Sequence, residues 1–175
     1  MTDDLRAAIE TEVERGARAL GLRHGPVHAE LRAGRDGVFV LEIAARPIGG
    51  LCSKALRFEG EWSLEDVLLA HALGDDVSSY RREHEASAVM MIPIPKRGVL
   101  KHVEGEAQAR ACEHVTDVRI TAKPDQLIEP LPEAGSYLGF IFASAPTPEQ
   151  ADAAVRDAHA RLVFRIDPAI DLVAR

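Results

Sequence analysis

The sequence predicts an α+β protein built from two consecutive lobes. Three observations lead to this prediction: a helix followed by two alternating strands, a polar segment without periodicity, and a second series of apolar strands that ends in a long capped helix. The polar segment is DDVSSYRREHE (75–85), and we place the boundary there. We therefore expect one lobe over residues 1–80 and a small α+β lobe over residues 86–175.

The first lobe begins with a helix over residues 3–20, where apolar residues recur every four positions and Gly21 supplies the C-terminal cap. Two strands follow, at 26–33 and 37–44. A Pro-Ile-Gly-Gly loop then leads into a segment that turns helical before residue 58. Ser63 and Asp66 belong to a capping box that opens a helix running to Gly74. The apolar positions of the first helix are Leu5, Ile9, Val13 and Ala17.

The second lobe reads as alternating strands and helices. Its longest helix begins at Thr147, with Pro148 at the first helical position, and is expected to run to Phe164. Strands are expected at 88–94, 98–103, 115–122 and 137–143, and a short helix at 106–114.

Composition excludes several classes of protein. The net charge is −7 and the largest cationic cluster is Arg81-Arg82, which argues against a nucleic-acid partner. No apolar stretch approaches the roughly 20 residues of a membrane helix, and the acidic, helical start argues against a targeting peptide. Cys52 and Cys112 form neither a CxxC pair nor a disulfide framework, so a reducing cytoplasm is the expected setting.

The two strands of the first lobe carry the most informative pattern. With Arg35-Asp36-Gly37 as a three-residue hairpin loop, residues whose numbers sum to 72 face each other. Glu30 then opposes Glu42, Arg32 opposes Val40, and His28 opposes Ala44. One face is wholly apolar and is expected to be the core side. That apolar face comprises Val27, Ala29, Leu31, Phe39, Leu41 and Ile43.

Two opposed carboxylates predict a cation between them. Directly opposed residues have Cβ atoms about 5 Å apart, and like charges placed so are destabilising. Mg²⁺ suits hard oxygen ligands and commonly takes one or two protein carboxylates. Arg46 follows the second strand and offers a fork for a phosphate or carboxylate, while Gly49 and Gly50 permit close approach of a backbone to a ligand.

The pairing geometry leaves a simpler interpretation open. Glutamates on the outer face of a hairpin are commonly just solvated, and Arg32 can pair with either of them. His28 is more often a packing or hydrogen-bonding histidine than a ligand.

The same residues resemble a known family. His28-Ala-Glu30-Leu, followed by Leu41-Glu42-Ile-Ala-Ala-Arg46-Pro-Ile-Gly-Gly50, is similar to the C-terminal subdomain of the ATP-grasp fold in carboxylate–amine ligases, which include the L-amino-acid ligases. The resemblance covers residues 16–75 well and 86–165 more loosely. It implies an antiparallel sheet with flanking helices, in which Glu30 and Glu42 bind the Mg²⁺ or Mn²⁺ that bridges ATP phosphates. It also implies that Arg46 contacts the phosphate or the carboxylate substrate.

Two departures from the family pattern qualify what the resemblance implies. Ala44 stands where many members have an asparagine as a further metal ligand. All four lysines follow the metal motif, so the phosphate-binding lysines and glycine-rich flap of the earlier ATP-grasp subdomain have no counterpart in this sequence. We expect the chain to be the C-terminal half of a larger enzyme, completed by an N-terminal half, a complementary chain or a homo-oligomer. The lysines are Lys54, Lys96, Lys101 and Lys123.

The resemblance implies phosphoryl transfer from ATP to a small carboxylate, giving an acyl phosphate that an amine attacks. Glu30 and Glu42 would hold the metal, Arg46 would steady the phosphate, and His28 or His24 is a candidate for handling the amine proton. A non-catalytic remnant or partner-binding subunit is the alternative. A third hypothesis is a small ligand-binding module whose binding is insensitive to Glu42→Ala.

Overall fold

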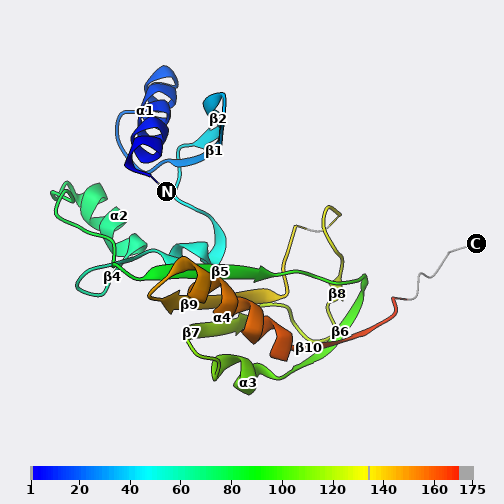
Figure 1. Ribbon diagram of the computed structural model, residues 1–175. Helices are drawn as coiled ribbons and strands as arrows, with labels where there is room; N and C mark the ends of the chain where they lie inside the picture. Colours follow the sequence, from blue (N-terminus) through cyan, green and yellow to red (C-terminus); the bar gives the residue numbers. More distant parts are fainter. Residues whose placement is uncertain (1, 134, 170–175) are drawn as a thin grey trace, which may run out of the picture. The chain divides into compact units, whose positions relative to one another are not determined.

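The structure is a computed structural model that describes residues 2–133 and 135–169. The chain divides into two compact units, residues 1–82 (unit 1) and 83–175 (unit 2) (Figure 1). No helix in the described part of the chain combines the length and the apolar character that a membrane span requires. Unit 1 contains α1 (Asp3–Ala19), β1 (His28–Gly34), β2 (Gly37–Ala44), the 3-10 helix η1 (Gly50–Ala55), β3 (Arg57–Phe58), β4 (Trp62–Ser63) and α2 (Leu64–Leu73).

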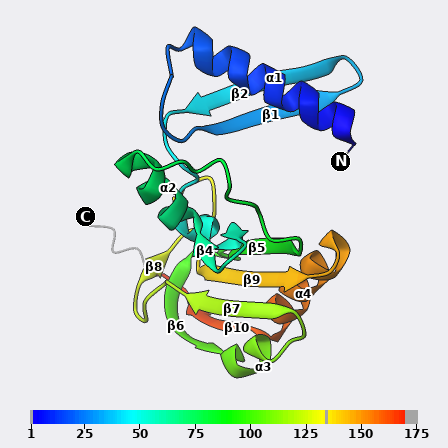
Figure 2. The same cartoon turned by 90° about the vertical axis from the view of Figure 1, so that its left-hand side faces the viewer.

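Helix α1 lies across the β1–β2 hairpin in unit 1 (Figure 2). The Thr2 hydroxyl accepts a hydrogen bond from the Leu5 N–H at 3.4 Å, and Gly21, with φ of +74°, follows the helix end as predicted. The helix approaches the hairpin closely, because a Cβ added at Gly16 would lie 2.4 Å from Cδ1 of Ile43. The four predicted apolar positions, Leu5, Ile9, Val13 and Ala17, are all half-buried.

The hairpin confirms the predicted opposition of Glu30 and Glu42 but reaches it by a different route. Gly34 pairs with Gly37, so the turn has two residues and not three. A β-bulge then shifts the register between Glu30 and Leu31 and restores the pairing of Glu30 with Glu42 and of His28 with Ala44. The predicted pairing of Arg32 with Val40 is wrong, because Arg32 pairs with Phe39.

The bulge also changes which residues share a face. Leu31 pairs with Val40, and both are half-buried, whereas Phe39 and Leu41 are 55% and 67% exposed. The expectation that Phe39 and Leu41 lie on the core side is therefore wrong. Opposed residues project from the same side of a hairpin, so Phe39 shares the face of Arg32 and hence of the two glutamates.

Helix α2 has the predicted capping box. The Ser63 hydroxyl accepts from the Asp66 N–H at 3.2 Å, and the Asp66 carboxylate accepts from the Ser63 N–H at 2.9 Å. The Ser63 hydroxyl also donates to the Asp66 carboxylate at 2.6 Å, and this bond, together with the one from the Ser63 N–H, holds the pKa of the Asp66 carboxyl below its ordinary value. Gly74, with φ of +88°, ends the helix as expected.

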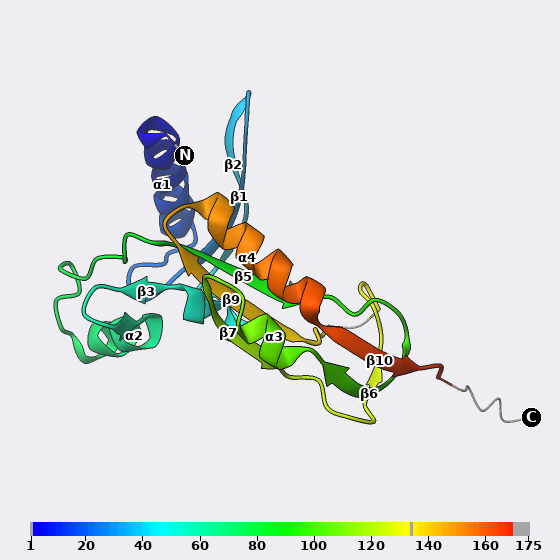
Figure 3. The same ribbon diagram turned by 60° about the horizontal axis from the view of Figure 1, so that its bottom comes forward.

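The described residues of unit 2 form two antiparallel sheets and two helices (Figures 1 and 3). One sheet has the strand order β5-β9-β7 and the other β10-β6-β8. Helix α4 packs against β5 and β9, and α3 packs against α4 and β7. The elements are β5 (Ala86–Ile92), β6 (Gly98–Glu104), α3 (Glu106–Arg110), β7 (Val115–Ile120), β8 (Leu127–Ile128), β9 (Gly139–Ala145), α4 (Pro148–Arg161) and β10 (Val163–Asp167).

Several details of unit 2 differ from the prediction, among them the short strand β8, which was not expected. Helix α4 ends at Arg161, short of Phe164, because Leu162 adopts an extended backbone with φ of −84° and ψ of 134°. The residues that follow form β10, an unpredicted strand that pairs with β6. Helix α3 ends at Arg110, well short of residue 114.

The buried core lies in unit 2. Among the described residues, every fully buried apolar side chain belongs to unit 2, and Ile92, Leu100, Val118, Leu138 and Ile141 are nearly inaccessible. Within the described part of unit 1, apolar side chains are half-buried or exposed, and Leu69 and Leu73 of α2 are 63% and 82% exposed. Hydrophobic burial therefore stabilises unit 2 much more than unit 1.

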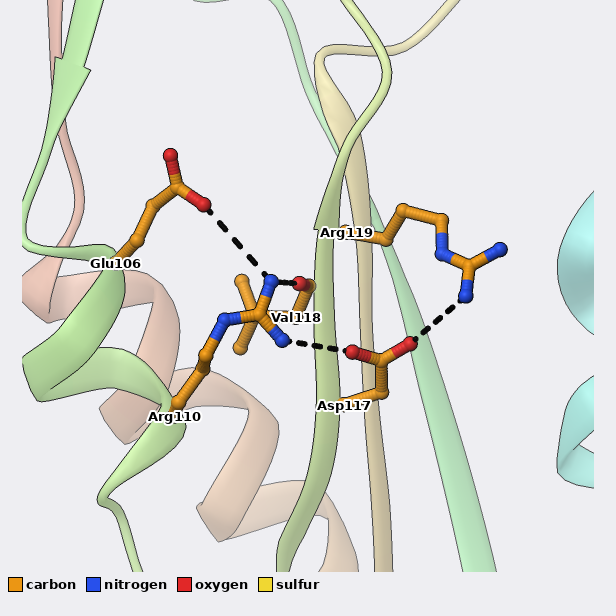
Figure 4. A network of polar contacts seen from close by, with 5 residues as sticks. All are labelled: Glu106, Arg110, Asp117, Val118 and Arg119. Carbon is orange, nitrogen blue, oxygen red and sulfur yellow. Dashed lines mark hydrogen bonds and ion pairs between the residues drawn. The ribbon is translucent and has the colours of Figure 1, made fainter.

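A polar network fastens α3 to β7 (Figure 4). The Arg110 guanidinium donates to the Asp117 carboxylate at 2.7 Å and to the Val118 carbonyl, and Glu106 lies 3.9 Å from it. Arg119 approaches the other Asp117 oxygen at 3.4 Å. Desolvation opposes the charged form of Asp117, but the two arginines outweigh it and keep the pKa of this carboxyl below its ordinary value.

We expect this network to make unit 2 sensitive to acid. A carboxyl whose pKa is lower in the folded state stabilises the fold above its unfolded pKa of about 3.9, and that contribution is lost as pH falls through the folded pKa. Asp117→Asn should cost about 0.5 to 1 kcal/mol at pH 7 and progressively less below about pH 4. Urea unfolding at both pH values measures this. Asp157→Asn is the control, since no described residue pairs with the Asp157 side chain; a cost for Asp117→Asn that is independent of pH would contradict the electrostatic account.

Candidate functional site

Glu30 and Glu42 lie opposite each other on one face of the β1–β2 hairpin. Both residues are exposed to solvent. In the described part of the chain, the Glu42 side chain forms no hydrogen bond or ion pair, and the Arg32 side chain pairs with neither glutamate. The alternative in which Arg32 neutralises the acids is therefore not the arrangement in this structure.

His28 is the polar neighbour of the acid pair. Its Nε2 lies 3.7 Å from Oε1 of Glu30, two residues along the same strand, and its side chain is 27% exposed. It faces Ala44 across the hairpin, as predicted. His28, Glu30 and Glu42 thus share one face, with a histidine at the edge of the two carboxylates.

Arg46 and the two glycines follow directly after β2. The Arg46 Nη1 donates to the Pro47 carbonyl at 3.1 Å and lies 3.9 Å from the position a Cβ would take on Gly49. Gly50 has φ of +63°, a conformation that favours glycine, whereas Gly49 has an ordinary extended backbone. The guanidinium therefore folds back over its own loop, and within the described residues it forms no ion pair with Glu30 or Glu42.

The loop is anchored on its far side by α2. The hydroxyl of Ser53 in η1 donates to Oε1 of Glu65 at 2.7 Å, and Ser53 is the one polar residue that is buried within the described chain. This bond holds the pKa of the Glu65 carboxyl below its ordinary value. The segment that carries Gly49 and Gly50 is thus tied between β2 and the first turn of α2.

The acid pair suits a hard divalent cation whose remaining ligands are water or phosphate oxygens. Its oxygens are exposed, opposed and free of basic partners apart from His28. The described residues contain no cluster of three or more histidine, cysteine or acidic side chains of the kind that cages a metal. Mg²⁺ commonly takes only one or two protein carboxylates and completes its shell with water and phosphate oxygens, so two glutamates suit it.

The structure adds Phe39 to this face. An exposed aromatic ring on the same face as the two carboxylates was not predicted, because the assumed three-residue turn placed it on the opposite side. The position of Phe39 could have been predicted from Gly34 and Gly37, because two glycines that flank Arg35-Asp36 also suit a two-residue hairpin turn.

Comparisons with known proteins agree with the resemblance seen in the sequence. Residues 1–55 match the ATP-grasp domain model, and residues 90–167 match the model of L-amino acid ligase C-terminal domain 2. A curated relative, the uncharacterized protein y4rH of Sinorhizobium fredii, is 26% identical over 98% of this chain. The chain spans only 36% of that relative's length.

Solved structures show the same fold. The L-amino acid ligase from Bacillus licheniformis superposes with a TM-score of 0.81 at 25% identity, covering 95% of this chain and 42% of that one. Phosphoribosylglycinamide synthetase from Anaerococcus prevotii gives a TM-score of 0.77 at 16% identity, covering 95% and 43%. In both cases this chain corresponds to less than half of the similar protein.

Proposed function

This chain has the fold of the C-terminal portion of ATP-grasp ligases and matches the sequence models of two of their domains, and on this premise we propose that it supplies the metal-binding part of an ATP-dependent carboxylate–amine ligase site. The observation that carries the proposal is the opposition of two exposed glutamates, Glu30 and Glu42, which among the described residues have no arginine or lysine partner and only His28 as a basic neighbour. The bulge that restores this pairing after a two-residue turn supports the same conclusion.

Each residue has a role that its chemistry suits. When bound, Mg²⁺ or Mn²⁺ neutralises charge on the ATP phosphates. Glu30 and Glu42 present the oxygens that hold the cation, and His28 orients Glu30 from 3.7 Å. Arg46 can swing from the Pro47 carbonyl to an incoming phosphate or carboxylate, because its present partner is a neutral backbone oxygen.

The reaction proposed is transfer of the ATP γ-phosphoryl group to a small carboxylate, followed by attack of an amine and formation of an amide. The carboxylate oxygen gains the phosphoryl group while ADP leaves, and the amine then displaces phosphate and loses a proton. Catalysis of this kind rests on positioning and charge neutralisation, which are the contributions of Glu30, Glu42 and Arg46. The cations that hold the nucleotide on its other side would come from a lysine-bearing half.

A non-catalytic role is the second candidate. Unit 1 exposes several large apolar side chains, including Leu69, Leu73 and Leu41, and such surface suits a partner-binding subunit derived from an ATP-grasp enzyme. In that case the acids would serve solubility, and nucleotide would not bind.

Isothermal titration of Mg·ATP separates these candidates. The chain is titrated alone and as a chimaera, in which it replaces the matching C-terminal portion of the Bacillus licheniformis ligase. We expect metal-dependent nucleotide binding that is much tighter in the chimaera than in the chain alone, with the intact ligase as positive control. A folded chimaera that binds no nucleotide would favour the partner-binding role. Metabolite stabilisation of the chain that survives Glu42→Ala would favour a small ligand-binding module.

A further inference from the structure

An open groove of about 590 Å³ lies between α3 and α4 in unit 2. Its volume falls within the range of small-molecule sites, about 300–1,000 Å³. Residues of α4 from Gln150 to Arg161 form one wall, and Gln108 with the turn after α3 forms the other. The groove uses no residue of unit 1 and is not part of the glutamate site.

The two helices hold a fixed spacing. Ala109 and Ala158 are fully buried and Ala154 is 6% exposed, so small side chains let the helices approach closely. At the end of α4, a Cβ on Gly105 would lie within 1.9 Å of the Arg161 carbonyl oxygen. Close packing therefore fixes the positions of the two helices, and the polar side chains that line the groove are attached to this rigid backbone.

Two opposite charges line the groove without pairing. Asp157 and Arg161 are one helical turn apart, the spacing at which Asp–Arg pairs ordinarily form. The preceding pair of the same type and spacing on α4, Asp152 and Arg156, forms an ion pair at 2.7 Å. Within residues 2–133 and 135–169, neither the Asp157 carboxylate nor the Arg161 guanidinium has a hydrogen-bond or ion-pair partner.

The turn after α3, which lines part of the groove, has a strained backbone. His114 has φ of +65°, which is rare for a residue other than glycine, and it is held there because its carbonyl accepts from the Ser144 N–H at 3.0 Å. Its side chain is 29% exposed and lines the groove. Backbone strain of this kind, about 1–3 kcal/mol, is concentrated at ligand sites.

We propose that this groove binds a small zwitterion with a free ammonium and a free carboxylate, either an α-amino acid or a short peptide. Arg161 takes the carboxylate through its planar fork, and Asp157 takes the ammonium. The amide side chains of Gln108 and Gln150 are placed to hydrogen-bond a peptide group or a polar side chain of the ligand. The proposal does not rest on the ligase function.

The test is NMR titration of the full chain, without metal or nucleotide, using L-alanine and L-alanyl-L-alanine as probes. We expect saturable shifts of signals from α3, α4 and His114. Asp157→Asn and Arg161→Gln should each weaken binding by about tenfold or more, because each removes a hydrogen bond to a charged group. Tight binding of one probe and not the other identifies the ligand as amino acid or peptide.

Matched variants and ligands make the test decisive. Asp152→Asn and Arg156→Gln remove the same charges from the paired positions of α4 and should leave binding unchanged. Glu42→Gln should also leave it unchanged, so failure of the glutamate site and failure of this proposal are distinguishable. Absence of saturable shifts, equal binding in Arg161→Gln, or equal shifts with acetate or methylammonium alone would overturn the proposal.

Discussion

Replacing Glu42 by glutamine is expected to reduce Mg²⁺-dependent nucleotide binding while making the free chain slightly more stable. The variant removes one of two hard oxygen ligands at the hairpin. Mutation of residues that only hydrogen-bond to metal ligands lowers metal affinity by about 10- to 100-fold. Loss of a direct ligand should therefore lower the affinity for Mg·ATP by about 100-fold or more. Without metal, the same change relieves like-charge opposition across the strands and should stabilise unit 1 by about 0.2–1 kcal/mol.

Observing both effects, weaker metal-dependent binding and a more stable free chain, would identify the acid pair as a cation site. Titration of Mg·ATP into the chimaera measures the first effect, and urea unfolding of the metal-free chain measures the second. Asp36→Asn is the matched control, because Asp36 lies in the turn of the same hairpin and has no place in the opposed pair. If Asp36→Asn and Glu42→Gln weakened binding equally, general charge and not the opposition of Glu30 and Glu42 would account for the affinity.

Replacing Gly105 by alanine is expected to destabilise unit 2 severely. Gly105 has φ of +86° at the start of α3, and its added Cβ would lie within 1.9 Å of the Arg161 carbonyl oxygen. A backbone carbonyl at the end of a packed helix cannot move aside as a flexible side chain can. We expect a cost of about 3 kcal/mol or more, combining left-handed strain with the clash. For a unit of this size, that lowers the melting temperature by about 12 to 24 °C.

Gly74 separates strain from clash in this prediction. It has nearly the same backbone, with φ of +88°, but among the described residues no atom outside its own helix and chain neighbours lies within 4 Å of the position a Cβ would take there. Gly74→Ala should therefore cost only about 1 kcal/mol. Thermal and urea unfolding followed by far-ultraviolet circular dichroism compares the two variants. Equal costs would mean that the contact between Gly105 and the end of α4 contributes nothing to the stability of unit 2.

Local pattern was enough to predict the main elements of the fold and the centre of the candidate site. Alternation alone identified the strands of the hairpin, and the Ser63 capping box and Thr147 cap fixed the starts of α2 and α4. The opposition of Glu30 and Glu42 was likewise predictable, because two different hairpin geometries lead to it. The roles of Arg46, Gly49 and Gly50 in ligand binding stay predictions.

Features that depend on distant partners were not predictable. The strand β10 exists because Val163–Asp167 pairs with β6, and the helical spacing of apolar residues continued past the point where Leu162 turns extended. Phe39 was assigned to the wrong face because the bulge leaves no mark in the sequence. Residues alternate normally on either side of it, but the bulge itself places Phe39 on the face of Arg32 and the glutamates. The groove between α3 and α4 arises from the packing of two helices and has no signature in the sequence of either helix.

The bulge and the short turn of the hairpin compensate for each other. A two-residue turn displaces the register by one position relative to a three-residue turn, and the bulge between Glu30 and Leu31 restores it. Insertions and deletions in this hairpin should therefore come in pairs: a residue gained in the turn is compatible with facing glutamates only if one is lost at the bulge. A sequence alignment that judges each gap by itself would score such homologues as having lost the hairpin geometry, although their two glutamates would still oppose each other.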